Sequence, residues 1–167
     1  MDQTITLEGP GVIPSGGLDL NGGGGSNTLQ AIGGSHSLDF TTDGNIVARN
    51  FDRIDLSDPA ADVITIDAAS LAAISTTGAL LVRGGEGDGI SFDDVDDWRM
   101  GTTSMVDGRF VRKVTHLGNQ SIDTELPHAW QNVVKESDVN NNGEVTAGDA
   151  LIIINELGRR AFSNPAS

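Results

Sequence analysis

Short apolar segments recur along most of the chain, and they limit the possible folds more than any other feature. From Leu18 to about Leu126, apolar and polar residues alternate over short runs, so each run has one face that can be buried as a β-strand. Gly-rich or Asp-rich turns separate the runs at a spacing of roughly ten residues. The clearest runs are Leu18–Leu20, Thr28–Gln30, Ser37–Phe40, Arg53–Leu56, Val63–Ile66 and Leu80–Arg83. The pattern predicts a mainly β fold, solenoid-like or a sandwich, and does not separate the two.

Two later regions do not follow this pattern of short, regularly spaced strands. Asp67 can cap a helix of one or two turns over Ala68–Ile74. Longer antiparallel strands are predicted further on, and Asp107-Gly108 is a strong hairpin signal between two of them. The predicted strands are Trp98–Met100, Ser104–Val106, Phe110–Val114 and a closing strand at Gln120–Thr124. Pro127 then marks the expected boundary between a β-rich module, residues 1–126, and a smaller unit, residues 127–167, with α structure.

The net charge of the chain limits the partners that the protein can bind. Its formal net charge is −14, and 18 of the 24 acidic residues are Asp. Asp suits turns and cation binding, whereas Glu is the better helix former, so the excess of Asp indicates turns and calcium. A strongly negative field disfavours nucleic acid and anionic membrane surfaces as partners. No apolar run approaches the length needed for membrane insertion.

Residues 138–149 have the spacing of a calcium-binding loop followed by a helix. Oxygen-bearing side chains stand at the first, third, fifth and twelfth places, and Gly143 at the sixth permits the sharp turn. The residue at the seventh place supplies its backbone carbonyl, and the last ligand comes from the first turn of the exit helix. The predicted Ca²⁺ ligands are Asp138, Asn140, Asn142, Glu144 and Asp149. The alternative is an Asn-rich surface turn without metal.

Further expectations follow for this loop and its helix. The ligand side chains carry two formal charges and the last is Asp rather than Glu, so calcium binding is expected to be weak and suited to a calcium-rich surrounding. Val145 is expected to point into the core and fix the loop. The exit helix, expected over Ala150–Leu157, has to bury Leu151, Ile154 and Leu157, either on the β-rich module or on a second repeat that has been cut away.

The segment Asp-Val-Asn-Asn-Asn-Gly-Glu-Val-Thr-Ala-Gly-Asp-Ala-Leu with its Ile-rich helix resembles one repeat of a type I dockerin. The resemblance covers about residues 128–158 and implies calcium at the five ligands named above. Dockerins bind cohesin proteins, and the family's partner contacts lie near the tenth and eleventh loop places, here Ala147 and Gly148. A dockerin has two repeats packed together, whereas this chain holds one.

Two glycine-rich segments offer further candidate calcium sites. Gly22–Gln30 fits the nonapeptide of calcium β-rolls, with Asn27 in the place of Asp, and Gly84–Ile90 echoes it around Asp88. The acidic run Asp93–Asp97 is a third candidate. Ordinary glycine turns and a solvated acidic turn are the favoured interpretations of all three.

The order of motifs between residues 50 and 125 gives a wider resemblance. Phe51–Leu56, Asp62–Leu71 and Leu80–Asp88 are followed by Trp98 and by Val106-Asp107-Gly108. This series is similar to a module near the C-termini of giant bacterial repeat adhesins and calcium-dependent secreted proteins. The resemblance implies an extracellular or cell-surface location and a structural or adhesive role without catalysis.

No catalytic constellation is visible in the sequence. The three histidines lack zinc spacing, and there is no nucleophilic serine motif or phosphate loop. We therefore expect a non-enzymatic, calcium-binding structural or adhesive segment of a large secreted or cell-surface bacterial protein, in contact with other domains of its parent. One alternative is a dockerin-type module for a cohesin-like partner. Another is self-cleavage at Asp58-Pro59 or self-crosslinking through Lys113, for which a salt bridge is the favoured interpretation.

Overall fold

The computed structural model describes residues 1–9, 17–85, 87–93, 95–106, 109–125, 137–139 and 144–163. These residues form twelve strands, two α-helices and one short 3-10 helix. The strands are β1 (Thr4–Glu8), β2 (Leu18–Asn21), β3 (Thr28–Ile32), β4 (Ser37–Asp39), β5 (Ile46–Arg49), β6 (Arg53–Leu56), β7 (Val63–Ile66), β8 (Ala79–Gly84), β9 (Gly89–Phe92), β10 (Trp98–Val106), β11 (Arg109–His116) and β12 (Ser121–Glu125). The helices are α1 (Ala68–Ile74), η1 (Val95–Asp97) and α2 (Ala147–Ser163).

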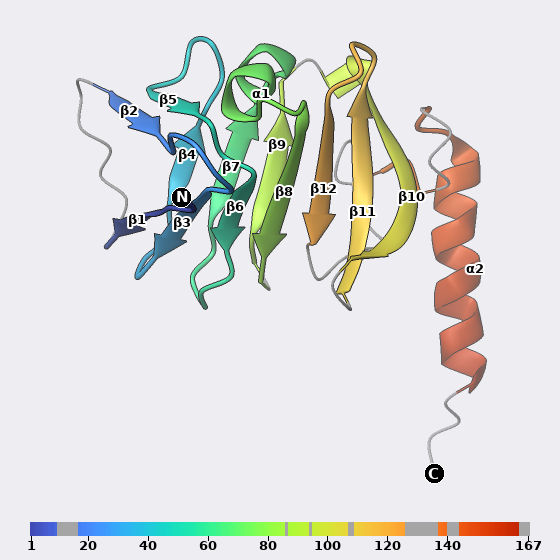
Figure 1. Cartoon of the computed structure of the whole chain (residues 1–167). Coiled ribbons are helices and arrows are strands. Elements are labelled where there is room, and N and C mark those ends of the chain that lie inside the picture. Colours follow the sequence, from blue (N-terminus) through green and yellow to red (C-terminus); the bar gives the residue numbers. More distant parts are fainter. Residues whose placement is uncertain are drawn as a thin grey trace.

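The chain coils through three sheets, and this arrangement decides between the two predicted folds. A seven-stranded sheet has the order β1-β3-β6-β8-β12-β11-β10, a second has the order β4-β7-β9, and a third pairs β2 with β5 (Figure 1). Successive turns of the coil pair in parallel, so that Thr4 lies beside Thr28, and Thr28 beside Arg53. The mainly β prediction is therefore confirmed, and the fold is a β-solenoid rather than a sandwich.

The core of the solenoid is formed by the inward residues of the alternating strands. Leu29, Ile54 and Val82 lie at matching heights on neighbouring strands and have exposed fractions of 0%. All six predicted short strands are present, but β1, β5 and β9 were not predicted. The reason for β9 is local composition, since its Gly89 belongs to a segment whose glycines indicate turns. The segment is a strand because it pairs in parallel with β7, a strand from an earlier part of the chain.

Side chains of Asp and Asn join successive turns of the solenoid at its corners. There the backbone leaves the sheets, and each N–H needs another acceptor. His36 N donates to Asp62 Oδ1 at 2.6 Å, and Asp62 N donates to Asp88 Oδ1 at 2.8 Å. The same contact occurs between Gln3 and Asn27, Asn27 and Asp52, Gly33 and Asp58, and Thr42 and Asp67. We call these contacts the corner ladders, and they give five of the Asp residues a structural role.

The glycine-rich candidates for calcium belong to these ladders. Asn27 has an exposed fraction of 1%, and its Nδ2 donates to the carbonyl of Asn50 at 2.9 Å. Asp88 accepts from Gly85 N and Asp62 N. Both side chains serve backbone groups of the turns, which agrees with the favoured interpretation of ordinary glycine turns.

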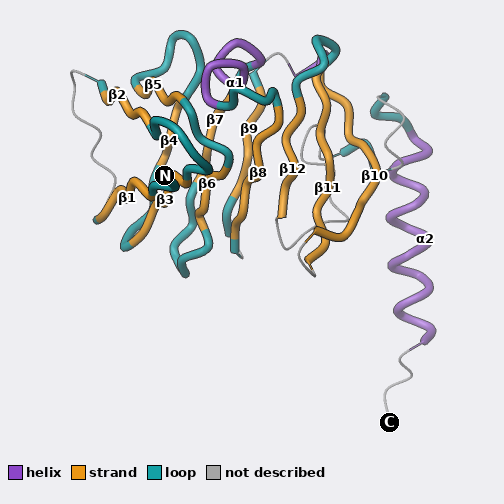
Figure 2. The backbone as a smooth tube through the Cα atoms, viewed as in Figure 1, coloured by secondary structure: helices purple, strands orange, loops and turns teal. Residues whose placement is uncertain are grey.

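The helix α1 lies next to β5, where a strand would otherwise continue the coil, and is seen at the top of Figure 2. Asp67 caps it as predicted, since its side chain accepts from Ser70 N while Ser70 Oγ accepts from Asp67 N. The same carboxylate accepts from Thr42 N at 2.9 Å on the preceding turn. Burial by itself raises the pKa of Asp67, but the hydrogen bonds from Ser70 and Thr42 outweigh burial and hold it below the ordinary value of 3.8.

The last three strands close one end of the solenoid. The region predicted as two strands is the single strand β10, with an irregular register between Met100 and Thr103. The predicted hairpin is present because β10 pairs antiparallel with β11, although Asp107 and Gly108 lie outside the described residues. β12 then closes the sheet by pairing in parallel with β8.

Aromatic packing stabilises this end, and ion pairs lie on its strands. Trp98 is buried against Phe92 and His116, with ring centroids at 4.6 and 5.0 Å, and its Nε1 donates to Asp93 O at 3.1 Å. Lys113 Nζ lies 3.8 Å from Asp123 Oδ1, which agrees with the salt-bridge interpretation of this lysine. The predicted boundary at Pro127 stays a prediction, because residues 126–136 lie outside the described part of the chain.

We predict that Asp67→Ala lowers the free energy of unfolding at neutral pH by about 2 kcal/mol, since it removes a helix cap and a contact between two turns. Because the pKa of Asp67 is lowered in the folded state, its contribution is present above pH 3.8 and is lost as the pH falls through the folded-state value. Urea denaturation across this range measures the difference from the wild type. Asp43→Ala, at an exposed position, is the control, and equal losses in both variants would contradict the prediction.

Candidate calcium site

The predicted loop contains two nearly inaccessible carboxylates. Asp138 and Asp149 each have an exposed fraction of 1%, although most of the neighbouring described residues are exposed. Glu144 lies between them in the described part, whereas Asn140 and Asn142 lie outside the described residues. The complete predicted ligand set therefore stays a prediction, and the described residues show how the carboxylate of Asp149 is held.

The start of α2 fixes the direction of the Asp149 side chain. Its Oδ2 accepts from Thr146 N at 2.8 Å and from Thr146 Oγ1 at 3.1 Å. Thr146 Oγ1 accepts in turn from Gly148 N at 3.2 Å. These contacts make Thr146 the helix cap and Asp149 its reciprocal partner, as in a capping box. The carboxylate thus turns back from the helix toward the loop, where a cation would lie.

The available donors fit calcium. Asp138 and Asp149 are both buried, and the hydrogen bonds from Thr146 to Asp149 Oδ2 offset part of the cost of burying that carboxylate. Oxygen ligands without nitrogen or sulfur suit a hard cation such as Ca²⁺. The described residues contain no cluster of three His, Cys, Asp or Glu side chains. A loop of this kind does not require one, because two of its ligands are Asn and one is a backbone carbonyl.

The expectation for Val145 was wrong, and of the two alternatives for the apolar residues of α2, burial on the β-rich module is contradicted. Val145 has an exposed fraction of 61% and does not point into a core. Leu151 and Ile154 are 56% and 62% exposed, so they are not buried on the solenoid, and Leu157 lies in a stretch whose side chains are not described. Ile152 and Ile153 are also exposed, at 42% and 46%. The reason is that α2 stands beyond the edge strand β10, clear of the solenoid core (Figure 1).

The sequence contains a signal for this exposure, although the spacing of the loop does not reveal it. Residues 151–154 are four consecutive apolar residues. An α-helix has 3.6 residues per turn, so four in a row surround the whole axis. A helix of this kind cannot bury all four against one flat surface. At least part of the apolar surface of α2 is therefore available to another structure.

Comparison with known proteins supports this reading of the C-terminal segment. Residues 135–166 match the family model of the dockerin type I domain. No curated protein and no solved structure matches the chain. The chain therefore carries a single type I dockerin domain C-terminal to a β-rich region, as predicted, and this domain is a calcium-binding protein–protein interaction module. The wider resemblance to adhesins receives no support from these comparisons.

Among the described residues, no helix has the length and apolar character to cross a membrane.

We predict that calcium binds the chelator-treated chain at one site with a dissociation constant of about 0.1–1 mM, the range of extracellular modules. Asp138→Ala removes the first ligand and abolishes saturable binding. Asp149→Asn keeps an acceptor for Thr146 N but loses a charge, so it weakens binding while preserving the helix start. Isothermal titration calorimetry measures affinity, and circular dichroism measures helix content. With Asp43→Ala as control, unchanged binding in Asp138→Ala would show that the loop is not the site.

Proposed function

We propose that this chain is a non-enzymatic, calcium-dependent attachment module of a secreted or cell-surface protein. In it the β-solenoid is the structural segment and α2 makes the contact with a cohesin-like protein. The observation that carries the proposal is the exposure of four consecutive apolar residues, Leu151–Ile154, in the segment that matches the dockerin domain. Large exposed apolar patches on soluble proteins commonly mark interaction sites.

The surface at the start of α2 supports the same function. Ala147 and Gly148, the places at which the family contacts its partners, are both exposed. They are small residues, so a partner can approach the helix closely at this point. They also lie directly beside the capping contacts of Thr146 and Asp149. The contact surface and the calcium loop are thus parts of one local structure.

Calcium has a structural task in this proposal. Without the ion, Asp138 and Asp149 are two buried carboxylates in one loop, and their repulsion opposes the folded loop. With the ion, the loop holds the first turn of α2 in place and presents its surface. Dockerins occur in extracellular and cell-surface proteins. There, calcium is abundant enough for a loop with only two charged ligand side chains.

The solenoid supports a structural role because its buried ionisable groups are engaged in holding the coil together. His36, with an exposed fraction of 4%, lies 3.0 Å through Nδ1 from Asp62 Oδ1 in a corner ladder. His116 packs against Trp98. Neither histidine is placed as a base beside an exposed nucleophile in the described residues. The adhesive role drawn from the wider resemblance rests on the sequence alone.

We predict that at least one member of a panel of type I cohesin domains binds the full chain in calcium and dissociates in chelator. Ala147→Arg places a long charged side chain on the contact surface and weakens binding tenfold or more, roughly the effect of losing an interface hot spot. Ile154→Ser weakens it by removing exposed apolar area. Surface plasmon resonance measures both effects.

Ala72→Arg is the matched control, because it makes the same substitution at an exposed position of the other helix, α1. It is expected to bind like the wild type. If no cohesin binds to a chain that still binds calcium by calorimetry, the proposed attachment function is wrong, whereas the assignment of the calcium loop is unaffected. If Ala72→Arg weakens binding as much as Ala147→Arg, the contact is not at α2.

A further inference from the structure

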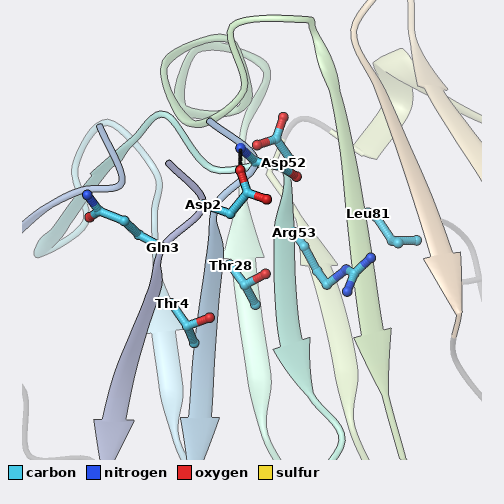
Figure 3. Close-up of a pocket in the computed structure, with 8 residues that line it drawn as sticks. Asp2, Gln3, Thr4, Thr28, Asp52, Arg53 and Leu81 are labelled. Carbon is cyan, nitrogen blue, oxygen red and sulfur yellow. Dashed lines mark hydrogen bonds between the residues drawn. The ribbon is translucent and has the colours of Figure 1, made fainter. Parts of the chain in front are cut away.

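A polar cavity lies across the outer face of the large sheet, far along the chain from the calcium loop. Its volume is about 310 Å³, and its floor is a row of residues paired in register on four parallel strands (Figure 3). Thr4, Thr28, Arg53 and Leu81 form this row on β1, β3, β6 and β8. Asp2, Gln3, Ser26 and Asp52, from the adjoining turns, complete the lining. At about 4.8 Å between strands, the row spans roughly 14 Å.

Arg53 is the most informative residue of the cavity. A guanidinium has five N–H donors, yet that of Arg53 makes no hydrogen bond or ion pair with the described residues, and its Nε is buried. Other arginines of the solenoid are paired, Arg49 with Asp19 and Arg109 with Glu125. Donors left unsatisfied in a partly closed space carry a free-energy cost. Arg53 is thus suited to a molecule that brings oxygen acceptors into the cavity.

The two carboxylates of the cavity offer the complementary chemistry. Asp2 Oδ1 accepts from Ser26 N, and Asp52 Oδ2 accepts from Asn27 N, each at 2.9 Å. These contacts hold both side chains at the corner above the row, as Figure 3 shows for Asp2 and Asp52. The second oxygen of each makes no hydrogen bond with the described residues. A ligand with hydroxyl donors would satisfy these oxygens.

The carboxylates, the guanidinium and the hydroxyls that line the cavity favour some classes of ligand over others. Two carboxylates beside one guanidinium, on a chain with a net charge of −14, oppose an anion such as phosphate. The guanidinium opposes a cation. A neutral molecule with many hydroxyls both donates and accepts, so it matches the carboxylates, Arg53 and the hydroxyls of Thr4 and Thr28 together. Leu81 offers an apolar surface for the C–H face of a sugar ring.

We propose that this cavity is a binding site for a neutral, linear carbohydrate that lies across β1, β3, β6 and β8 and hydrogen-bonds to Arg53. The length of the row favours a chain of several sugar units over a single ring. Since the lining is polar and has only one large apolar side chain, the affinity is low, with a dissociation constant on the order of 1 mM. The proposal is independent of the cohesin contact, because it uses the solenoid and not α2.

The test is a nuclear magnetic resonance titration of the full, calcium-loaded chain with neutral tetrasaccharides: cellotetraose, maltotetraose and mannotetraose, each to about 10 mM. At least one is expected to shift the signals of Thr4, Thr28 and Leu81 in a saturable way. Arg53→Gln is expected to weaken this binding about tenfold, the effect of losing hydrogen bonds to a charged group. Arg49→Gln, the same substitution in the exposed pair with Asp19, leaves it unchanged.

Asp52→Asn is the second variant, because it keeps an oxygen acceptor for Asn27 N while removing the charge. It is expected to fold and to bind more weakly, and unchanged signals away from the cavity check the fold of both variants. The proposal is overturned if no neutral tetrasaccharide shifts these signals, or if Arg53→Gln binds like the wild type. It is equally overturned if inorganic phosphate or tetragalacturonic acid binds there and the neutral sugars do not.

Discussion

The solenoid depends on one kind of contact, in which a backbone N–H at a corner donates to an Asp or Asn side chain one turn further along the coil. Strand pairing satisfies the backbone within the sheets, but it ends at each corner. There, the side chains of residues such as Asn27, Asp62 and Asp67 accept hydrogen bonds from backbone N–H groups about 25 residues away. The apolar residues of the strands, Leu29 and Ile54 among them, stack in register because these corner contacts hold successive turns at matching heights.

The same contacts concentrate negative charge, which the fold has to accommodate. Burial raises the pKa of Asp88 above its ordinary value, and the neighbouring charges of Asp62 and Asp58 add to this effect. A raised pKa means that ionised Asp88 opposes folding, and this opposition grows as the pH rises above 3.8 toward the folded-state value. Asp67 shows the opposite balance, because its hydrogen bonds exceed the cost of burial. Each of the two carboxylates accepts from two backbone N–H groups; Asp67 also has side-chain hydrogen bonds from Ser70 and Thr42, whereas Asp88 faces the charges of Asp62 and Asp58.

Two surfaces among the described residues carry groups whose hydrogen-bonding or apolar surface is not used within the fold. Arg53 faces a cavity with its donors unused, and Leu151–Ile154 face water on α2. In the coil itself, the Asp and Asn side chains of the corner ladders accept from backbone N–H groups, and the inward apolar residues of the strands fill the core. The imbalance of these two surfaces, polar in the first case and apolar in the second, is the physical reason for assigning an external binding function to each. They differ in chemistry and in position along the chain, so their functions are separable by experiment.

The sequence by itself determined the features that depend on residues close together in the chain. Alternation predicted six strands, Asp67 predicted the cap of α1, and the spacing from Asp138 to Asp149 predicted the dockerin-type loop. The tertiary structure alone decided what depends on residues about 25 positions apart. It decided that the fold is a solenoid and not a sandwich, and it pairs β9 with β7. It also aligns Arg53 with Thr28 and Leu81 on neighbouring strands, and it leaves the apolar residues of α2 exposed. Local pattern fixes which face of a strand is apolar, but the neighbour of each strand is set by the packing of the whole coil.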